Sequence, residues 1–404
     1  MTPNPISERV PLKYRFSEVH IDMRIIHLVQ RFPPDIGGVE NHVFNLARKL
    51  SERHKVTVFT FGRETSTGRF DSVEVVRFPF VEVNWRTGFT RLSIKMAAEL
   101  ARTGAEIIHA HSYGFTHVDM AARIRRIQKK PILLTAHYDR SPASSKIIKT
   151  FRTLYDNFIG IPTLNMADRV IALTEHEKRF LNREFRVDLS KISVIPNGVD
   201  LEAFLSPPEP KPLIERYGLK EDQVVLYVGR IDEKKGIQYL IRSAKLVLSE
   251  VPRCKYLIVG PDWGALRMLK DMSIREGIAE NIIFTGAIPA EELLMAYNLC
   301  DLLALPSLGE ATGLVVLEAM ASKRPVIATD MPVIRELIEQ EENGLLVKPG
   351  DVEGLAEATV RLLKDDKLKR RMGIEAFNRI KLKDWQHVAE ETERLYNDVL
   401  SHLK

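Results

Sequence analysis

Short apolar segments alternate with amphipathic segments along almost the whole chain. The first apolar segment is 23–29, and after it Val39, Val43 and Leu46 recur at the spacing of one helix face. Buried strands that alternate with helices are typical of βαβ units and a parallel sheet. The sequence therefore predicts an α/β fold. The expected strands are 23–29, 55–60, 106–111, 131–136 and 169–173, and then 223–229, 255–260, 282–285, 302–305 and 325–329.

A proline-rich stretch interrupts this alternation in the middle of the chain. Residues 206–212 contain four prolines, which exclude a regular helix or central strand. A chain of 404 residues is also too long for one ordinary core. We therefore expect two Rossmann-like, doubly wound domains that face each other across a cleft. The expected parts are a domain at 1–200 that begins with an extension at 1–22, a domain at 201–384, and a final helix, about 385–404, that packs back on the first domain.

The charge is distributed unevenly between the two halves. Residues 1–200 carry 31 Lys and Arg against 21 Asp and Glu, a balance of +10, whereas the remainder has a balance of −5. A basic half favours an anionic partner such as a lipid headgroup, a phosphate or an acidic glycan. A solvated basic surface without a partner is an equally good interpretation.

Composition indicates a soluble globular protein of a reducing compartment. Hydrophobic residues make up 45% of the chain and charged residues 28%. The two cysteines, Cys254 and Cys300, are too few for a disulfide framework and lie in apolar segments. No apolar run is long enough to span a bilayer, and residues 1–22 lack the apolar core of a signal peptide. We expect a cytoplasmic protein.

Two glutamates around a predicted helix start form the strongest candidate binding site. The strand 302–305 leads into a short loop, and a helix is expected to begin close to Gly313. Glu310 lies before this helix and Glu318 inside it, in an apolar context in which a carboxylate is costly to bury. Carboxylates accept hydrogen bonds from sugar hydroxyls, although a glutamate at a helix start is also a common capping residue. The free amides at the helix start suit a diphosphate, and they belong to Thr312, Gly313 and Leu314.

A second candidate segment follows the strand 223–229. Gly229 lets the backbone approach a ligand, and Arg230 and Lys235 place two cations within six residues. A guanidinium and an ammonium bind a diphosphate, and their effect is greatest when negative charge develops on the leaving group. An exposed basic turn is the alternative interpretation.

The first half offers a glycine pair and several histidines. Gly37 and Gly38 open a helix directly after the first strand, so they too offer backbone donors for a phosphate, and a tight turn alone is the alternative. No Gly-x-Gly-x-x-Gly fingerprint occurs, which removes the main support for a dehydrogenase. His109 and His111 end a strand and point the same way. No third or fourth ligand has a spacing typical of zinc, so we expect no metal site. His137 is expected either to line the same cleft or to be a structural histidine.

Four of these segments together resemble the family-4 retaining glycosyltransferases, which have the GT-B fold. The resemblance covers nearly the whole chain from about residue 23. It rests on Gly-Gly-Val-Glu at 37–40, Ile-Pro-Asn-Gly-Val-Asp at 195–200, Gly-Arg…Lys-Gly at 229–236 and Glu-x7-Glu at 310–318. The family usually has Phe-Gly where this chain has Thr312-Gly313, so the resemblance does not specify the donor sugar.

The resemblance implies a role for each candidate residue. Glu310 would contact the donor sugar, Glu318 the ribose, and Arg230 and Lys235 the diphosphate. His111 would lie beside the transferred sugar. The donor, a nucleotide diphosphate sugar, would bind mainly to the second domain. A glycan, lipid-linked or small polar acceptor would bind to the first domain, and no nucleic acid is expected.

The resemblance also implies retention of configuration without a metal or other cofactor. The leaving phosphate would take the acceptor proton on the same face of the sugar, and the protein would position the reactants and stabilise charge. The absence of any Asp-x-Asp triplet agrees with this. A sugar-nucleotide epimerase or a phosphorylase on the same scaffold is one alternative. A non-catalytic nucleotide-sugar-binding module is another, against which the four charged site residues argue.

One basic helix of the first half suggests a contact with a membrane. Residues 144–158 combine a broad apolar face with Lys146, Lys149 and Arg152. A helix packed on its own domain is the commoner explanation and is preferred for this segment. Our hypothesis is nevertheless that the basic half contacts the anionic inner face of a membrane while it handles a lipid-linked acceptor.

Overall fold

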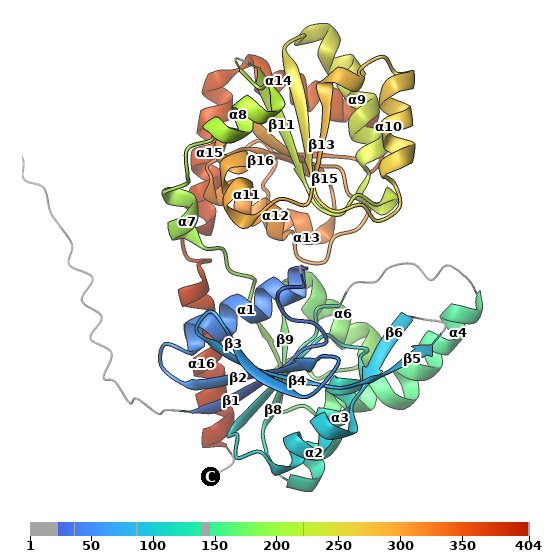
Figure 1. The fold of residues 1–404 in the computed structure, drawn as a ribbon, viewed down its shortest axis with the longest axis vertical. Coiled ribbons are helices and arrows are strands. Elements are labelled where there is room, and N and C mark those ends of the chain that lie inside the picture. The colour runs from blue at the N-terminus through green and yellow to red at the C-terminus, as the bar shows by residue number, and fades with distance from the viewer. Residues whose placement is uncertain are drawn as a thin grey trace, which may run out of the picture.

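The computed structural model describes residues 23–35, 37–85, 88–128, 130–138, 146–220 and 222–402. The expected N-terminal extension, 1–22, lies outside the described residues. The described chain forms two lobes, each built around one sheet (Figure 1).

The first lobe contains an eight-stranded sheet in the order β10-β9-β8-β7-β1-β2-β4-β3. All neighbouring strands are parallel except β3, which pairs antiparallel with β4 at one edge. A two-stranded antiparallel ribbon, β5-β6, accompanies it. The strands are β1 (Arg24–Leu28), β2 (Lys55–Phe61), β3 (Ser66–Phe70), β4 (Val73–Phe78), β5 (Val81–Trp85), β6 (Gly88–Leu92), β7 (Ile107–His111), β8 (Ile132–Thr135), β9 (Arg169–Ala172) and β10 (Ile192–Val194).

The second lobe contains a six-stranded sheet in the order β13-β12-β11-β14-β15-β16, parallel throughout. Its strands are buried on both faces, which explains their continuous apolar sequences. They are β11 (Gln223–Val228), β12 (Cys254–Val259), β13 (Ile282–Gly286), β14 (Leu302–Leu305), β15 (Val326–Thr329) and β16 (Gly344–Val347).

Helices cover both sheets. An amphipathic helix buries its apolar stripe by packing it against a face of the sheet. Those of the first lobe are α1 (Gly38–Leu50), α2 (Ile94–Arg102), α3 (Thr116–Gln128), α4 (Lys146–Tyr155), the π-helix η1 (Asp156–Gly160), α5 (Ile161–Met166), α6 (Glu175–Phe185) and the short η2 (Leu189–Lys191). After these come α7 (Leu201–Leu205), α8 (Lys211–Tyr217), η3 (Glu233–Lys235), α9 (Ile237–Glu250), α10 (Leu266–Arg275), η4 (Ala279–Asn281), α11 (Ala290–Leu299), α12 (Leu314–Ala321), α13 (Pro332–Arg335), α14 (Val352–Lys364), α15 (Asp366–Ile380) and α16 (Trp385–Ser401).

The ten strands predicted from the alternation of apolar segments are all present, and the two Rossmann-like sheets confirm the predicted fold class. The strands that the pattern did not predict lie mainly at sheet edges. The predicted helix start close to Gly313 is also confirmed, since α12 begins at Leu314. Both cysteines are buried and unpaired, as expected.

The chain crosses between the lobes twice, and the two crossings lie side by side. The backbone N–H of Val199 donates to the carbonyl of Lys383 (2.9 Å), and Val199 forms an isolated bridge with Asp384. Beyond this point α16 packs along the first lobe (Figure 1), where Trp385, Val388 and Tyr396 join a cluster with residues of β1 and α1. No described helix has the length and apolarity that a membrane crossing requires.

Candidate functional site

Two loops at the carboxyl edge of the second sheet lie against each other. One follows β11 and contains Arg230 and Lys235, and the other follows β14 and contains Glu310. The backbone N–H of Leu308 donates to the carbonyl of Lys234 (2.9 Å), which joins the loops. At Gly236, with φ of 71°, an added Cβ would lie 2.0 Å from the carbonyl oxygen of Pro306. The second loop therefore packs directly on the backbone of the first.

This packing brings Lys235 and Glu310 together. The Lys235 ammonium donates to Glu310 Oε1 at 2.6 Å, and the two side chains are only 17% and 13% exposed. Charge-assisted hydrogen bonds of this kind fix both partners in orientation. A cation and a carboxylate thus lie side by side at the carboxyl edge of the sheet, where open α/β folds bind ligands.

Arg230 is exposed and held by a residue from a third loop. Its guanidinium carbon lies 4.5 Å from the centre of the Trp263 ring, a cation–π geometry. Below it, the buried Tyr227 hydroxyl donates to the Arg230 carbonyl (3.0 Å). Burial, and then the Glu310 carboxylate, raise the pKa of Tyr227, so this anchor stays neutral.

The helix α12 presents its N-terminus beside this pair. Gly313 is its N-cap with φ of 65°, and no side chain caps the helix, so the amides near Thr312 and Leu314 are available to an anion. Glu318 Oε2 accepts a hydrogen bond from the Tyr297 hydroxyl (2.7 Å). Burial raises the pKa of the Glu318 carboxyl from 4.5 to about 7.

The first lobe contributes the start of α1. Gly37 is the N-cap of this helix in an extended conformation, and Gly38 is its first residue. The buried Glu40 carboxylate is ion-paired with Arg31 (3.0 Å) and lies over Gly37, where an added Cβ would be 2.2 Å from its Oε2. Gly38 has no atom within 4 Å of an added Cβ. A side chain at position 37 would displace the Glu40 carboxylate, and Gly38 leaves the helix start open.

A cavity of 210 Å³ lies between the two lobes. Asn41 and Asn45 of α1 line it from one side, and Leu314 and Glu318 of α12 from the other, with Trp385 at the crossing. Two predicted site residues of α12, Leu314 and Glu318, therefore line this cavity.

His111, the predicted contact of the transferred sugar, lies in the interior of the first lobe. It is fully buried at the end of β7, between His27 of β1 and His137, which follows β8. His27 Nδ1 is 2.9 Å from His111 Nε2, and His111 Nδ1 is 3.3 Å from His137 Nε2. Burial lowers the pKa of all three imidazoles, that of His27 to about 3, so they are neutral at neutral pH. Ser112 and His137, which border this site, have left-handed backbones with φ of 76° and 46°.

Family models match both halves of the chain. Residues 36–203 match Glycosyltransferase Family 4, and residues 212–379 match Glycosyl transferases group 1. The chain belongs to the family-4 glycosyltransferases. It is an enzyme of sugar transfer, and all four segments that carried the resemblance overlap the matched ranges.

Relatives of this glycosyltransferase match over nearly its whole length. It is 28% identical to an uncharacterised glycosyltransferase of Methanocaldococcus jannaschii over 93% of this chain and 98% of that one. It is 29% identical to the D-inositol 3-phosphate glycosyltransferase of Nocardia farcinica over 92% and 87%. With the phosphatidyl-myo-inositol mannosyltransferase of Mycolicibacterium smegmatis it shares 27% identity over 90% of each chain.

Solved structures confirm the fold of the glycosyltransferase. Sucrose-phosphate synthase from Thermosynechococcus elongatus superimposes with a TM-score of 0.77 at 23% identity, over 94% of this chain and 100% of that one. The Anabaena protein HepE, solved with UDP and glucose, superimposes with a TM-score of 0.76 at 22% identity, over 93% and 99%.

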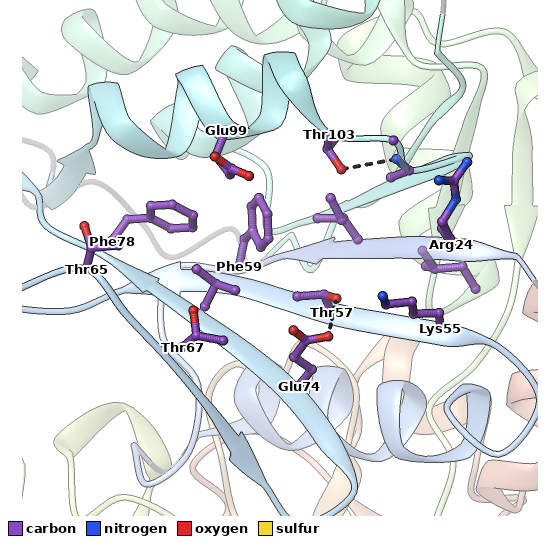
Figure 2. A pocket seen from close by; sticks show the side chains of 15 residues that line it. Arg24, Lys55, Thr57, Phe59, Thr65, Thr67, Glu74, Phe78, Glu99 and Thr103 are labelled. Atoms are coloured by element: carbon purple, nitrogen blue, oxygen red, sulfur yellow. Dashed lines mark hydrogen bonds between the residues drawn. The ribbon is translucent and has the colours of Figure 1, made fainter.

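The glycosyltransferase has a second, larger cavity that contains none of the predicted site residues. It measures 540 Å³ and lies between α2 and the first sheet. Figure 2 shows Glu99 on α2 to one side and Thr57 with Glu74 on strands to the other. Arg24 and Lys55, the first residues of β1 and β2, line one end of it. Phe78, the last residue of β4, also lines it, so the cavity extends along the face of the sheet.

Sequence reasoning missed several residues that hold the site in place. Tyr297 binds Glu318 from α11, Trp263 stacks on Arg230 from the loop after β12, and Asn197 binds His42 Nδ1 (2.6 Å). Asn197 lies in the segment 195–200, one of the four that carry the resemblance, so the sequence could have indicated it. Tyr297 and Trp263 lie in segments without any such motif.

Proposed function

We propose that this glycosyltransferase takes its sugar from a nucleotide diphosphate sugar, retains the anomeric configuration and needs no metal. The observation that carries the proposal is the Lys235–Glu310 pair (2.6 Å) beside the uncapped N-terminus of α12. A ligand that carries both a diphosphate and sugar hydroxyls satisfies all of these groups together. In support, HepE, which shares the fold, was solved with UDP and glucose.

In the proposed reaction the bond between the sugar C1 and the diphosphate oxygen breaks, and a bond between C1 and the acceptor oxygen forms on the same face. The acceptor proton passes to the leaving phosphate. Lys235, Arg230 and the α12 amides stabilise the negative charge that develops on the diphosphate. Glu310 orients the sugar hydroxyls, Glu318 binds the ribose, and the neutral His111 contacts the transferred sugar. Gly37 and Gly38 let the start of α1 approach the phosphates.

The acceptor in this proposal is a glycan or a lipid-linked molecule with an anionic group. Two relatives act, by their names, on inositol phosphate and on phosphatidyl-myo-inositol. The balance of +10 in residues 1–200 suits an acceptor of this charge.

The donor is tested by calorimetry of the purified protein against UDP-, GDP- and ADP-sugars in the presence of EDTA. We expect selective binding to one base that survives the chelator and weakens in Glu318→Ala. Binding that disappears with EDTA would contradict the metal-free site. Failure of every nucleotide sugar to bind would overturn the proposed donor class.

We further propose that the first lobe contacts an anionic membrane surface through α4 and η1. Phe151, Leu154 and Phe158 recur on one side of these helices and are 45%, 47% and 75% exposed. The structure exposes these three side chains, whereas Tyr155 of the same segment packs on its own domain, where its hydroxyl donates to Asp119 (2.9 Å). Exposed aromatic residues beside the cationic Lys149 are typical of interfacial helices.

Sedimentation with anionic liposomes at low salt tests this contact. We expect the wild-type protein to pellet, and Phe158→Ser to weaken binding by about tenfold, since burial of a Phe side chain contributes about 1.5–3 kcal/mol. Ile374→Ser is the matched control, because Ile374 is 52% exposed on α15 of the other lobe. Wild-type protein that stays in the supernatant would disprove the membrane contact.

A further inference from the structure

Five histidines gather at the carboxyl edge of the first sheet. His27 comes from β1, His109 and His111 from β7, His42 from α1 and His137 from the end of β8. In the register of the sheet, His27 pairs directly with His109. The first four are at most 2% exposed. So many imidazoles without an acidic partner are unusual in a core, because each brings two polar nitrogens that must be satisfied.

Two of the buried ring nitrogens have no hydrogen-bond partner among the described residues, His27 Nε2 and His42 Nε2. The second of these has a defined chemical state. His42 Nδ1 lies 2.6 Å from Asn197 Oδ1, an oxygen that only accepts, so Nδ1 carries the proton. The lone pair of His42 Nε2 is therefore free. Metal-binding histidines are usually oriented in this way, through their other ring nitrogen.

The neighbouring imidazoles have the spacing that a metal ion requires. One ring nitrogen from each of His42, His111 and His137 lies within 4.8 Å of the other two. His111 Nδ1 and His137 Nε2 are 3.3 Å apart. Two nitrogens at about 2.1 Å from a tetrahedral zinc ion are about 3.4 Å from each other. These two nitrogens are thus already at ligand distance, and a ring nitrogen of His42 lies within 4.8 Å of both.

We propose that His42, His111 and His137 form a binding site for a first-row transition-metal ion of the Zn²⁺ type. The three imidazoles provide one nitrogen each, and the fourth position takes water or another small ligand. A second group, His27, His109 and His111, is the poorer site. Both ring nitrogens of His109 are bonded to groups outside this set, to the Tyr396 hydroxyl and to Thr135 Oγ1, each at 2.7 Å. The partner of His111 Nδ1 is instead His137, itself a proposed ligand.

Metal at this site inhibits sugar transfer. The ion occupies His111 Nδ1 and fixes the imidazole that is placed beside the transferred sugar, a consequence that rests on the proposed function. Binding of the ion does not rest on it. In the proposed reaction, which needs no metal, a transition metal therefore competes with catalysis.

Titration of the untagged full-length chain with Co²⁺, followed by visible absorption, tests the site directly. We expect one equivalent to bind with the intense bands of tetrahedral cobalt, and Zn²⁺ to displace it. His42→Gln and His137→Gln should each abolish the bands, and Asn197→Ala should weaken binding by about 10–100-fold. His402→Gln, which removes an exposed histidine, is the matched control and should bind like the wild type.

Absence of stoichiometric Co²⁺ binding to the folded wild-type chain would overturn the site, as would unchanged bands in both ligand variants. Circular dichroism establishes that each variant is folded. Transfer measured with added Zn²⁺ then tests the consequence. Inhibition of the wild type that is lost in His42→Gln supports it, whereas bound metal without inhibition would show that His111 does not contact the sugar and would leave the metal site standing.

Discussion

Lys235 and Glu310 stabilise each other's charge when no ligand is bound. At 2.6 Å and with little exposure, each neutralises the charge of the other, so removal of one leaves a partly buried charge without a partner. We expect Lys235→Ala and Glu310→Ala each to lower kcat for transfer by about 100-fold or more, because each removes a group that stabilises or orients the reacting centre. Steady-state kinetics on folded variants measures this. Near-wild-type transfer by either variant would contradict the site assignment.

We expect Glu318 to make donor binding depend on pH. Burial raises the pKa of its carboxyl to about 7, and only the ionised form accepts hydroxyl hydrogen bonds with both oxygens. The carboxyl is protonated as pH falls through this pKa, so we expect donor affinity to fall roughly tenfold from pH 8 to pH 6. Its neighbour Tyr297 does not titrate there, since burial and Glu318 raise the pKa of that hydroxyl well above 10.0.

The pH dependence is measured by calorimetry of donor binding, and Glu318→Gln is its control. The amide does not ionise, so affinity in the variant should be weaker and flat across the same range. An equal pH dependence in both proteins would assign it to another group, such as Glu177, whose pKa burial also raises to about 7.

The charged site residues were visible in the sequence, and the groups that hold them were not. Arg230, Lys235 and Glu310 lie in loops directly after predicted strands, so the local pattern places them at one edge of a sheet. Trp263, which packs on Arg230, and Tyr297, which binds Glu318, come from other loops and helices. Such partners are chosen by packing, which leaves no period or spacing in the chain.

Two loops act as one element because Gly236 allows their close approach. Gly236→Ala adds strain at φ of 71° and also places Cβ 2.0 Å from the Pro306 carbonyl oxygen, a backbone atom that cannot move aside. We expect a loss of about 3 kcal/mol of folding free energy, seen as a lower Tm in thermal unfolding.

Gly218→Ala separates the strain from the contact. Gly218 ends α8 with φ of 64°, close to that of Gly236, but an added Cβ meets no atom within 4 Å. This variant should lose only about 1 kcal/mol. Equal losses in the two variants would show that the contact with Pro306 contributes nothing.

The edge strand β3 was not predicted from the sequence, because it is exposed. Every residue of β3 is exposed, so the strand shows no apolar pattern, and it forms only because β4 offers an open edge. The central strands are buried on both faces and show continuous apolar sequences instead. Burial, rather than intrinsic preference, is what made a strand predictable here.

At the scale of the whole molecule, one carboxylate joins the lobes. Glu336, after α13 of the second lobe, accepts hydrogen bonds from the backbone N–H groups of Glu175 and His176 at 2.9 and 2.7 Å. These groups form the N-terminus of α6 in the first lobe, where a negative charge is favourable. The contact stabilises the arrangement of the two lobes in this structure.

Removal of this carboxylate should open the cleft. We expect Glu336→Ala to lose about 1–2 kcal/mol of contact between the lobes, with a larger radius of gyration in X-ray scattering and faster exchange of the Glu175 and His176 amides. Glu339→Ala is the control, because Glu339 is paired with Arg379 within the second lobe (3.1 Å). Identical scattering of Glu336→Ala and the wild type would show that other contacts hold the lobes.

The sequence alone determined the order of strands and helices and the loops that carry the charged residues, because hydrophobic period and turn chemistry act between near neighbours. Only the tertiary structure decided what surrounds His111. His42 meets Asn197 across 155 positions, and His109 meets Tyr396 across 287. The spacing of His109 and His111 indicated no third metal ligand, yet the fold brings His42 and His137 to the same point. Contacts between such distant residues depend on how the helices and strands of the first lobe pack, and no local pattern records them.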